Sequence, residues 1–503
     1  MQSESKKSGM GARGLVIREP LIFEKSVKGR IGFSLDCKEF CDYDRNYFPD
    51  ELRREELKDF PELSEVDVVR HFTRLSQYNF GVDTSMYPLG SCTMKYNPKL
   101  NEKIARLAGF ANLHPYAPPH LAQGALQIIY ELERYISEIS GFKAVTLQPA
   151  AGAQGEFAGL MMIRAALKAR GKPRKKVIVP DTAHGTNPAS SALNGYGVIG
   201  VKSSKDGFLK VSDVAEVMDD DVAAIMLTNP NTLGIFEEEI GKIADVVHKR
   251  GGFVYCDGAN LNALMGIARP GEMGVDVMQF NLHKTFSTPH GGGGPGSGPV
   301  GVTAELEPYL PLPRVFKEGS KYYLDYNIPT SIGRVKAFYG HFGVILRAYT
   351  YIRELGAGGL KKATEMAVLN ANYLKALMRD TYFLPKDYPS LHEVVFSDKN
   401  LEETGVTTMD VAKRLMDYGF HPPTVYFPLT VHGAIMIEPT ESESPETIEA
   451  FVGALKEIAR EAKENPELVK SAPNNPYLRR LDEVSAAKSP CLTWSCEMAE
   501  GEG

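Results

Sequence analysis

The chain has 503 residues and a formal net charge of −6. This length predicts two or three domains with ample apolar content, and the small acidic excess argues against a nucleic-acid or anionic-membrane surface, since either needs a basic face. No apolar run approaches the ~20 residues that span a bilayer, and the polar start MQSESKKSG lacks a signal-peptide stretch, so we expect a cytoplasmic protein.

Six cysteines are too few for a disulfide scaffold and fit a reducing compartment. Cys37 and Cys41, together with Cys491 and Cys496, could be read as a zinc site. Neither pair has CxxC spacing and no histidine accompanies them, so the sequence predicts no metal site. Cys92 is expected to pack as a small apolar side chain.

Residues 1–60 are charged and irregular, and we expect an arm that wraps a neighbour or the body. A large domain is predicted over 61–330, and a connector helix with a smaller C-terminal domain and tail over 331–503. The tail, with Cys491, Trp494 and Cys496, is expected to be peripheral.

Regular patterns begin near residue 125. Helical apolar spacing predicts helices over 127–141 and 155–173, which stop at glycine or proline, and another over 237–252. Four continuous apolar runs predict strands buried on both faces: KKVIVPD (175–181), AAIMLTNP (223–230), GFVYCDG (252–258) and VDVMQFN (275–281). Their alternation with helices predicts an α/β fold with a mainly parallel central sheet and helices on both faces.

Polar or ionisable residues follow each of these four strands. Such sheets bind ligands beyond the carboxyl ends of their strands. Each run taken alone could be an ordinary strand with a polar turn, but the coincidence favours a site. The residues are Asp181 with His184, Thr228 with Asn229, Asp257 with Asn260, and His283 with Lys284.

A second α/β pattern occupies the C-terminal part. Residues 332–355 are expected to form one long amphipathic connector helix. Further helices are predicted over 360–380, 408–420 and 444–464, with strands at HEVVFS (392–397) and AIMIEP (434–439).

Lys284 lies in FNLHKTFSTPHGGGGPGSGPV, at the end of a predicted strand. A lysine that attacks an aldehyde must be partly desolvated or lie near positive charge, so that its neutral form is accessible near pH 7. The glycine run lacks the GxxxxGK[ST] pattern of a P-loop and does not match GxGxxG before a helix, which leaves a loop of close approach.

Three neighbours raise the interest of Lys284. Asp257 could hold a pyridine nitrogen protonated, or it could only cap a turn. His184 could stack on an aromatic ring or move a proton, or it could bind backbone in a turn. In QPAAGAQGEF, small residues through Ala153 and then Gln154 precede a helix, which suits a phosphate but also an ordinary tight loop.

Together these features fit pyridoxal phosphate on a fold type I (aminotransferase-like) scaffold. The chain resembles the glycine decarboxylase P-protein family of the glycine cleavage system, in its split form, and the half that carries the lysine. The resemblance spans essentially the whole chain in long strings: YPLGSCTMKYNP, HPYAP, GAQGEFAGL, HGTNPAS, DGANLNA, NLHKTFSTPHGGGGPG, IGRVKAFYGHFGVILRAY, HPPTVYFPL and MIEPTESES.

The resemblance assigns roles to eight residues. It implies that Lys284 binds the cofactor covalently and, with His184, serves the proton steps. The other implied cofactor contacts are Asp257 at the pyridine nitrogen, His184 and Ala259 on the two ring faces, Asn260 at the phenolic oxygen, and Ala153, Gln154 and His283 at the phosphate. The chain departs from commoner family strings at Ala150 and Ala151, which leaves backbone contacts intact.

The resemblance also implies a reaction and partners. The reaction is decarboxylation of glycine with transfer of the aminomethyl group to the lipoyl arm of the H-protein, and the partner is P-protein subunit 1 in a heterotetramer. YPLGSCTMKYNP and HPYAPPH could form an interface or the rim of the site, or could be ordinary packed loops. The alternatives are a cysteine desulfurase-like or aminotransferase-like enzyme, or a catalytically silent scaffold subunit.

Overall fold

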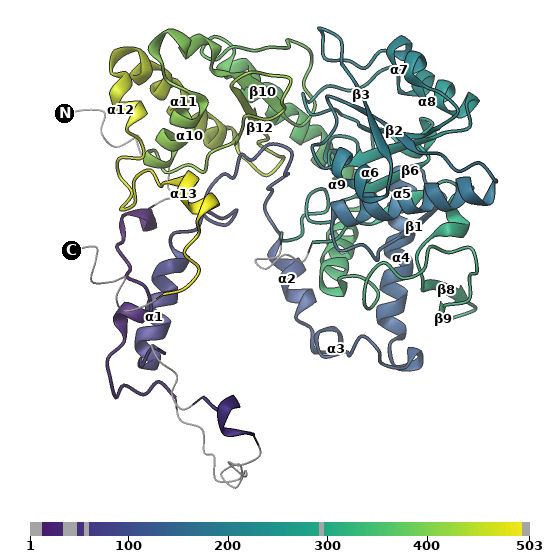
Figure 1. Ribbon diagram of the computed structural model, residues 1–503, viewed down its shortest axis with the longest axis horizontal. Helices are drawn as coiled ribbons and strands as arrows, with labels where there is room; N and C mark the ends of the chain where they lie inside the picture. The colour runs from purple at the N-terminus through teal and green to yellow at the C-terminus, as the bar shows by residue number, and fades with distance from the viewer. Residues whose placement is uncertain (1–12, 34–47, 55–59, 291–295, 495–503) are drawn as a thin grey trace.

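The computed structural model describes residues 13–33, 48–54, 60–290 and 296–494. Its centre is a seven-stranded sheet of order β1-β7-β6-β5-β4-β2-β3, in which only β7 runs antiparallel to its neighbours (Figure 1). The strands are β1 Ala144–Thr146, β2 Lys176–Pro180, β3 Gly197–Val201, β4 Val222–Thr228, β5 Phe253–Gly258, β6 Val277–Phe280 and β7 Val300–Val302. The four predicted strands and the mainly parallel sheet are confirmed.

Helices cover both faces of this sheet, which explains why its strands read as continuous apolar runs. On β4, Ile225 and Leu227 join one core with α4, α8 and α9, whereas Ala224 and Met226 join the opposite core with α5. The helices of this part are α4 Gln123–Ser140, α5 Gly152–Ala169, α6 Asn187–Leu193, α7 Val211–Val217 and α8 Ile240–Lys249. Helix α4 ends as predicted at Gly141, whose φ of 81° is left-handed.

The expected connector helix over 332–355 is wrong at its start. Helix α9 Phe342–Met378 is interrupted at Gly356 (φ 61°, ψ −176°), whose backbone is not helical, so two helices meet there at a kink. The break agrees with the separate helix predicted over 360–380. Residues before Phe342 do not continue the first helix because Phe338 and Gly340 have positive φ angles of 63° and 100°.

The C-terminal part has its own sheet and core. An antiparallel sheet of order β10-β12-β11 packs with α10 and α11 around side chains such as Phe396 and Phe451. The elements are β10 Val394–Ser397, β11 Thr424–Val425, β12 Ala434–Ile437, α10 Thr408–Asp417, α11 Pro445–Glu464 and α12 Pro466–Lys470, and a separate hairpin pairs β8 Arg314–Glu318 with β9 Lys321–Asp325. The domain boundaries at 60 and 330 stay a prediction.

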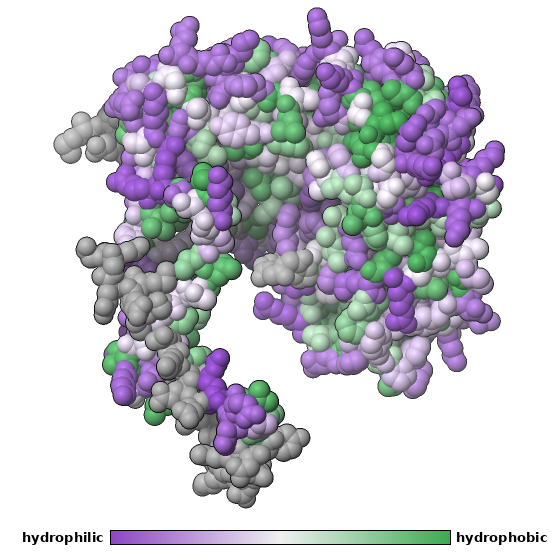
Figure 2. Space-filling view, in the orientation of Figure 1, coloured by the Kyte–Doolittle hydropathy of each residue, from purple (hydrophilic) through white to green (hydrophobic). Residues whose placement is uncertain are grey.

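The N-terminal segment and the C-terminal tail lie together, standing off the body (Figures 1 and 2). Trp494 stacks on Phe23 with ring centroids 5.0 Å apart, and the amide of Tyr477 donates to the carbonyl of Leu15 at 2.7 Å. The helices here are α1 Glu65–Ser76 and α13 Glu483–Lys488, while α2 Lys99–Ala105 and α3 Ala108–Ala111 lead into the body. Cys37, Cys41 and Cys496 fall outside the described residues.

Among the helices that the structure describes, none is long and apolar enough to cross a membrane.

Candidate functional site

The carboxyl ends of the parallel strands meet at one edge of the sheet, as the sequence predicted. The register places Thr228 opposite Asp257 and Asp257 opposite Gln279, on three adjacent strands. The Thr228 hydroxyl accepts a hydrogen bond from the amide of His184 at 3.0 Å, which ties the loop after β2 to the end of β4.

Two of the predicted edge residues form hydrogen bonds with the loops around them. Asp181 is exposed, and its carboxylate accepts from the amide of Ser203 at 2.8 Å. Asn229 holds a loop through the amide of Glu237, at 3.0 Å. Their place in the site stays a prediction.

Asp257 lies at the centre of the polar network, and 1% of its surface is exposed. Oδ1 accepts from the amide of Ala259 at 2.9 Å and from Nε2 of Gln279. Oδ2 accepts from Nδ2 of Asn187 at 3.1 Å and lies 4.0 Å from Nδ1 of His184. A carboxylate offers about four lone-pair positions, so these three donors leave room for one more N–H group.

Thr186 holds the ring of His184 through Nδ1. This nitrogen lies 2.9 Å from the hydroxyl of Thr186, which donates to Glu156 at 2.6 Å, and the amide of Thr186 donates to the same nitrogen at 3.5 Å. These contacts orient the ring and leave Nε2 as the nitrogen that Thr186 does not bind. Burial, with a smaller effect of the Lys284 amine, lowers the pKa of His184 and keeps the ring neutral.

The sequence analysis missed three polar residues that surround Asp257 and Thr186: Glu156, Asn187 and Gln279. The hydroxyl of Ser190 donates to the second oxygen of Glu156 at 2.7 Å. Burial, and then the negative charge of Asp257, raise the pKa of Glu156 to about 7. The signal was present: a glutamine in the apolar run of β6 and a glutamate on a helix of small and apolar residues are unusual in buried positions.

Lys284 follows β6 in a turn closed by its own amide and the carbonyl of Asn281, at 3.1 Å. Its side chain is partly buried, and Nζ donates to the carbonyl of Ser91 at 2.7 Å. Of the two predicted rim segments, YPLGSCTMKYNP therefore reaches the lysine, whereas HPYAPPH is mostly exposed.

His283 is a neutral hydrogen-bond donor beside the lysine. Burial and the neighbouring His290 lower the pKa of His283 to about 3. Its Nδ1 accepts from the amide of Ser297 at 3.2 Å, so the proton of the neutral ring lies on Nε2.

The N-terminus of α5 forms a cradle with the end of the glycine run. A Cβ on Gly298 would lie 2.0 Å from the carbonyl oxygen of Ala151, and one on Gly296 would lie 2.6 Å from Nδ1 of His283. The buried hydroxyl groups of Thr285 and Ser297 have no hydrogen-bond partner among the described residues. Free hydroxyl groups and the first amides of a helix are donors suited to a phosphate.

The side chains of Gln154 and Asn260 form hydrogen bonds that hold nearby loops. The Gln154 side chain accepts from the amide of Ala150 and donates to the carbonyl of Val335, both at 2.6 Å, so the side chain secures the turn and leaves the ligand to backbone amides. Nδ2 of Asn260 donates to the carbonyl of Pro230 at 2.8 Å, and its Oδ1 has no partner within the described part of the chain. Ala259 is 2% exposed and Ala153 is exposed.

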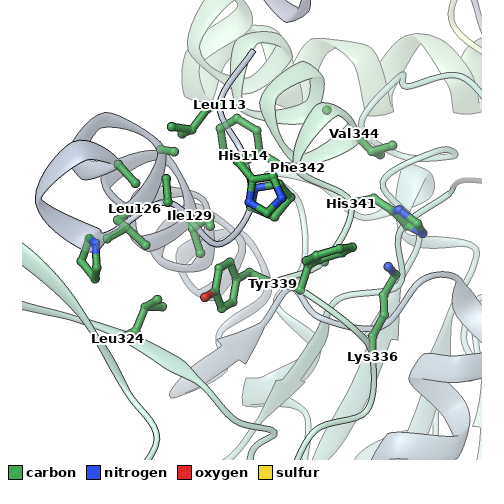
Figure 3. A pocket seen from close by; sticks show the side chains of 18 of the residues that line it. Leu113, His114, Leu126, Ile129, Leu324, Lys336, Tyr339, His341, Phe342 and Val344 are labelled. Carbon is green, nitrogen blue, oxygen red and sulfur yellow. The ribbon is translucent and has the colours of Figure 1, made fainter. Parts of the chain in front are cut away.

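A separate apolar pocket of about 510 Å³ lies beside HPYAPPH (Figure 3). Leu126 and Ile129 of α4 line it together with Phe342 and Val344 of α9, and its lining also includes His114, Lys336 and His341. None of the predicted site residues is among the described residues that line it.

This geometry fits pyridoxal phosphate, and sequence comparison places the chain in a family. The model of the family "Glycine cleavage system P-protein" matches residues 30–315, more than half of the chain. The chain belongs to the glycine cleavage system P-protein family. A second model, "Glycine dehydrogenase, C-terminal domain", matches residues 363–479.

The relatives of this chain match its sequence over nearly its whole length. A protein of Listeria innocua named "Probable glycine dehydrogenase (decarboxylating) subunit 2" is 55% identical over 481 residues, which cover 95% of this chain and 99% of that one. A crystal structure of glycine decarboxylase (P-protein) in inhibitor-bound form has a TM-score of 0.68 at 21% identity, covering 82% and 93% of the two chains. Oryza sativa TDC with PLP and tryptamine has a TM-score of 0.62 at 15% identity, covering 84% and 92%. These likenesses confirm fold type I.

We expect Glu156 to make the cofactor-free protein less stable as the pH rises. Its folded pKa of about 7 exceeds the ordinary value of 4.5, so its stabilising contribution is complete below about pH 4.5 and is lost as the pH rises through 7. Glu156→Gln stays neutral, so relative to wild type its thermal midpoint should rise between pH 5 and pH 8 by on the order of 3 °C.

Glu102→Gln is the matched control. The guanidinium of Arg347 lowers the pKa of Glu102, so this variant should differ from wild type by a constant amount over the same range. Parallel curves for wild type and Glu156→Gln would show that Glu156 is ionised throughout.

Proposed function

We propose that the chain is the lysine-bearing subunit of a pyridoxal phosphate-dependent glycine decarboxylase, which transfers the aminomethyl group of glycine to a lipoyl arm. The membership of the P-protein family and the relatives named glycine dehydrogenase (decarboxylating) subunit 2 support the activity. The single structural observation that carries it is Lys284 at the sheet edge that also holds the buried carboxylate of Asp257. Bound pyridoxal phosphate supplies an electron-withdrawing ring that accepts the electron pair left when carbon dioxide departs.

The chain's own residues would hold this cofactor from three sides. Lys284 would bind its aldehyde, and Asp257 would accept a hydrogen bond from a protonated ring nitrogen at the acceptor position that its three donors leave open. His184 and Ala259 would hold the ring, and Asn260 would contact its oxygen substituent. The amides of Ala153 and Gln154, with His283, would hold the phosphate.

Two groups are suited to moving protons near the substrate. Thr186 binds Nδ1 of His184, so Nε2 is the ring nitrogen that is left to exchange a proton. The amine of Lys284, which donates to the carbonyl of Ser91, is the second group. The burial of Asp257, Asn187 and Gln279 would keep water from the ring nitrogen of the cofactor.

The alternatives are less well supported. A silent scaffold subunit has no need of Lys284, Asp257 and His184 together at one edge. An aminotransferase-like or cysteine desulfurase-like enzyme shares the fold, but the relatives that cover nearly the whole chain carry the glycine dehydrogenase name.

The activity is tested by exchange of labelled bicarbonate into the carboxyl group of glycine, with P-protein subunit 1 and lipoylated H-protein present. We expect exchange with wild type and at least a thousandfold loss with Lys284→Ala, since general acid–base and covalent roles are both removed. Lys375→Ala removes another buried ammonium group, bound to the carbonyl of Tyr388 in the C-terminal part, and should retain exchange. Equal exchange by Lys284→Ala and wild type would refute the assignment.

We further propose a heterotetramer of two copies each of this chain and P-protein subunit 1. Support comes from the arm that stands off the body, where α1 exposes Val66, Val69 and Phe72 along one side (Figure 2). Exposed apolar side chains on a projecting helix are typical of a surface that another chain covers. The exposed HPYAPPH segment, with Tyr116, and its adjoining pocket would extend the same interface.

We expect the double variant Val69→Asp/Phe72→Asp to weaken binding of subunit 1 by at least about tenfold, because each change places a charge in an apolar contact. Leu193→Asp changes a single exposed leucine on the large domain and should bind normally. Affinity can be measured by titration calorimetry with purified subunit 1. Unchanged affinity of the double variant would remove α1 from the interface.

We also propose a cytoplasmic enzyme, supported by the low cysteine content and by the bacterial relatives.

A further inference from the structure

The segment 87–95 joins the C-terminal sheet to the lysine. Leu89 forms an antiparallel bridge with Ile437 of β12, and the hydroxyl of Thr424 donates to the carbonyl of Gly90 at 2.9 Å. A Cβ on Gly90 would lie 2.1 Å from the side chain of Met436, so the backbone lies directly on β12. The segment is therefore attached to the C-terminal part of the chain before it reaches Lys284.

Two buried carboxylates hold this segment in an uncommon conformation. Ser91 and Thr93 have positive φ angles of 60° and 46°, which cost free energy for residues other than glycine. Glu393, just before β10, accepts from the amide of Ser91 at 2.7 Å. Glu438, just after β12, accepts from the amide of Thr93 at 2.8 Å and from its hydroxyl at 2.6 Å.

This arrangement fixes the carbonyl group of Ser91 next to the amine of Lys284. With its amide bound to Glu393, Ser91 directs its own carbonyl oxygen to Nζ of Lys284, 2.7 Å away. Glu393 and Glu438 are both 0% exposed, so neither has water as an alternative partner. Residues 91–93 thus connect Lys284 to Glu393, beside β10, and to Glu438, beside β12.

We infer that Glu393 and Glu438 are positioning residues, which hold the Ser91–Thr93 main chain so that the Ser91 carbonyl receives and orients the amine of Lys284. This inference rests on the proposed function for its catalytic meaning. A substrate amine must displace Lys284 from the cofactor, and the displaced amine then needs an acceptor close by. The Ser91 carbonyl provides one without carrying charge.

The charges around the pair are consistent with this role. Burial and then the charge of Glu438 raise the pKa of Glu393 to about 8, and burial raises that of Glu438 to about 7, whereas the Lys284 amine lowers both. His392, fully buried within 4.0 Å of both acids, is neutral because burial lowers its pKa to about 3. Glu441, on the far side, is occupied by the ammonium group of Lys95 at 2.7 Å.

The test uses cofactor-free full-length protein and two readouts that need no catalysis. In Glu393→Leu and Glu438→Leu, which remove the acceptor oxygens, we expect the amides of Ser91 and Thr93 to exchange hydrogen for deuterium at least about tenfold faster than in wild type. We also expect the rate at which formaldehyde and cyanoborohydride methylate Lys284 to differ at least threefold from the rate in wild type. Both are measured by residue-resolved mass spectrometry.

Asp398→Leu is the matched control. Asp398 accepts from the amide and hydroxyl of Thr408, at 2.9 and 2.8 Å, in the same pattern as Glu438 with Thr93. This variant should loosen Thr408 and leave the amides of Ser91 and Thr93 unchanged. If the glutamate variants fail to fold, Thr93→Val and Ser91→Ala, which remove only the hydroxyl donors, replace them with smaller shifts in the same direction.

The inference would be overturned if, in the folded glutamate variants, both amides exchanged hydrogen and Lys284 was methylated at the rates seen in wild type. Altered readouts combined with absence of glycine–bicarbonate exchange in wild type would leave the positioning role standing and refute the proposed function instead.

Discussion

The candidate site is organised around one buried carboxylate. Asp257 lies near the end of the central strand β5 with almost no exposure to water, so its charge must be compensated by the protein or by a ligand. Three donors from β6, from α6 and from the turn after β5 supply part of that compensation. The position that they leave open is the most direct structural reason to expect a cationic ring nitrogen at this edge.

The surrounding layers follow from that constraint. Glu156 lies close enough to Asp257 to have its own pKa raised, and through Thr186 it helps to orient the ring of His184. Two further buried acids, next to strands of the C-terminal sheet, hold the backbone that faces Lys284. The amine of the lysine donates to the neutral carbonyl of Ser91 in that backbone.

The sequence predicted the large sheet well because its strands are buried on both faces and therefore stand out as apolar runs. It also predicted that Asp257, His184 and Lys284 lie near the ends of these runs at one edge of the sheet. It failed at 332–341, where helical apolar spacing was outweighed by the positive φ angles of Phe338 and Gly340. A strand end places a residue such as Asp181 or Asn229 at an edge without fixing where its side chain points.

The contacts across long sequence separations could not be predicted. The segment GSCTMK contains no local signal that Ser91 binds Glu393, some 300 residues away, or that Thr93 binds Glu438, 345 residues away. Each of these glutamates simply adjoins a predicted strand in the sequence. Gln279 and Asn187 are similar: their donors meet Asp257 only after three strands and a helix are assembled. Role assignments for the cofactor residues stay predictions.

The central claim is a covalent bond between Lys284 and the aldehyde of pyridoxal phosphate. Borohydride reduction of the holoprotein, followed by proteolysis and mass spectrometry, tests it most directly. The account predicts a stable pyridoxyl adduct on the peptide that contains Lys284. Release of the cofactor with Lys284 unmodified, or an adduct on a different lysine, would contradict it.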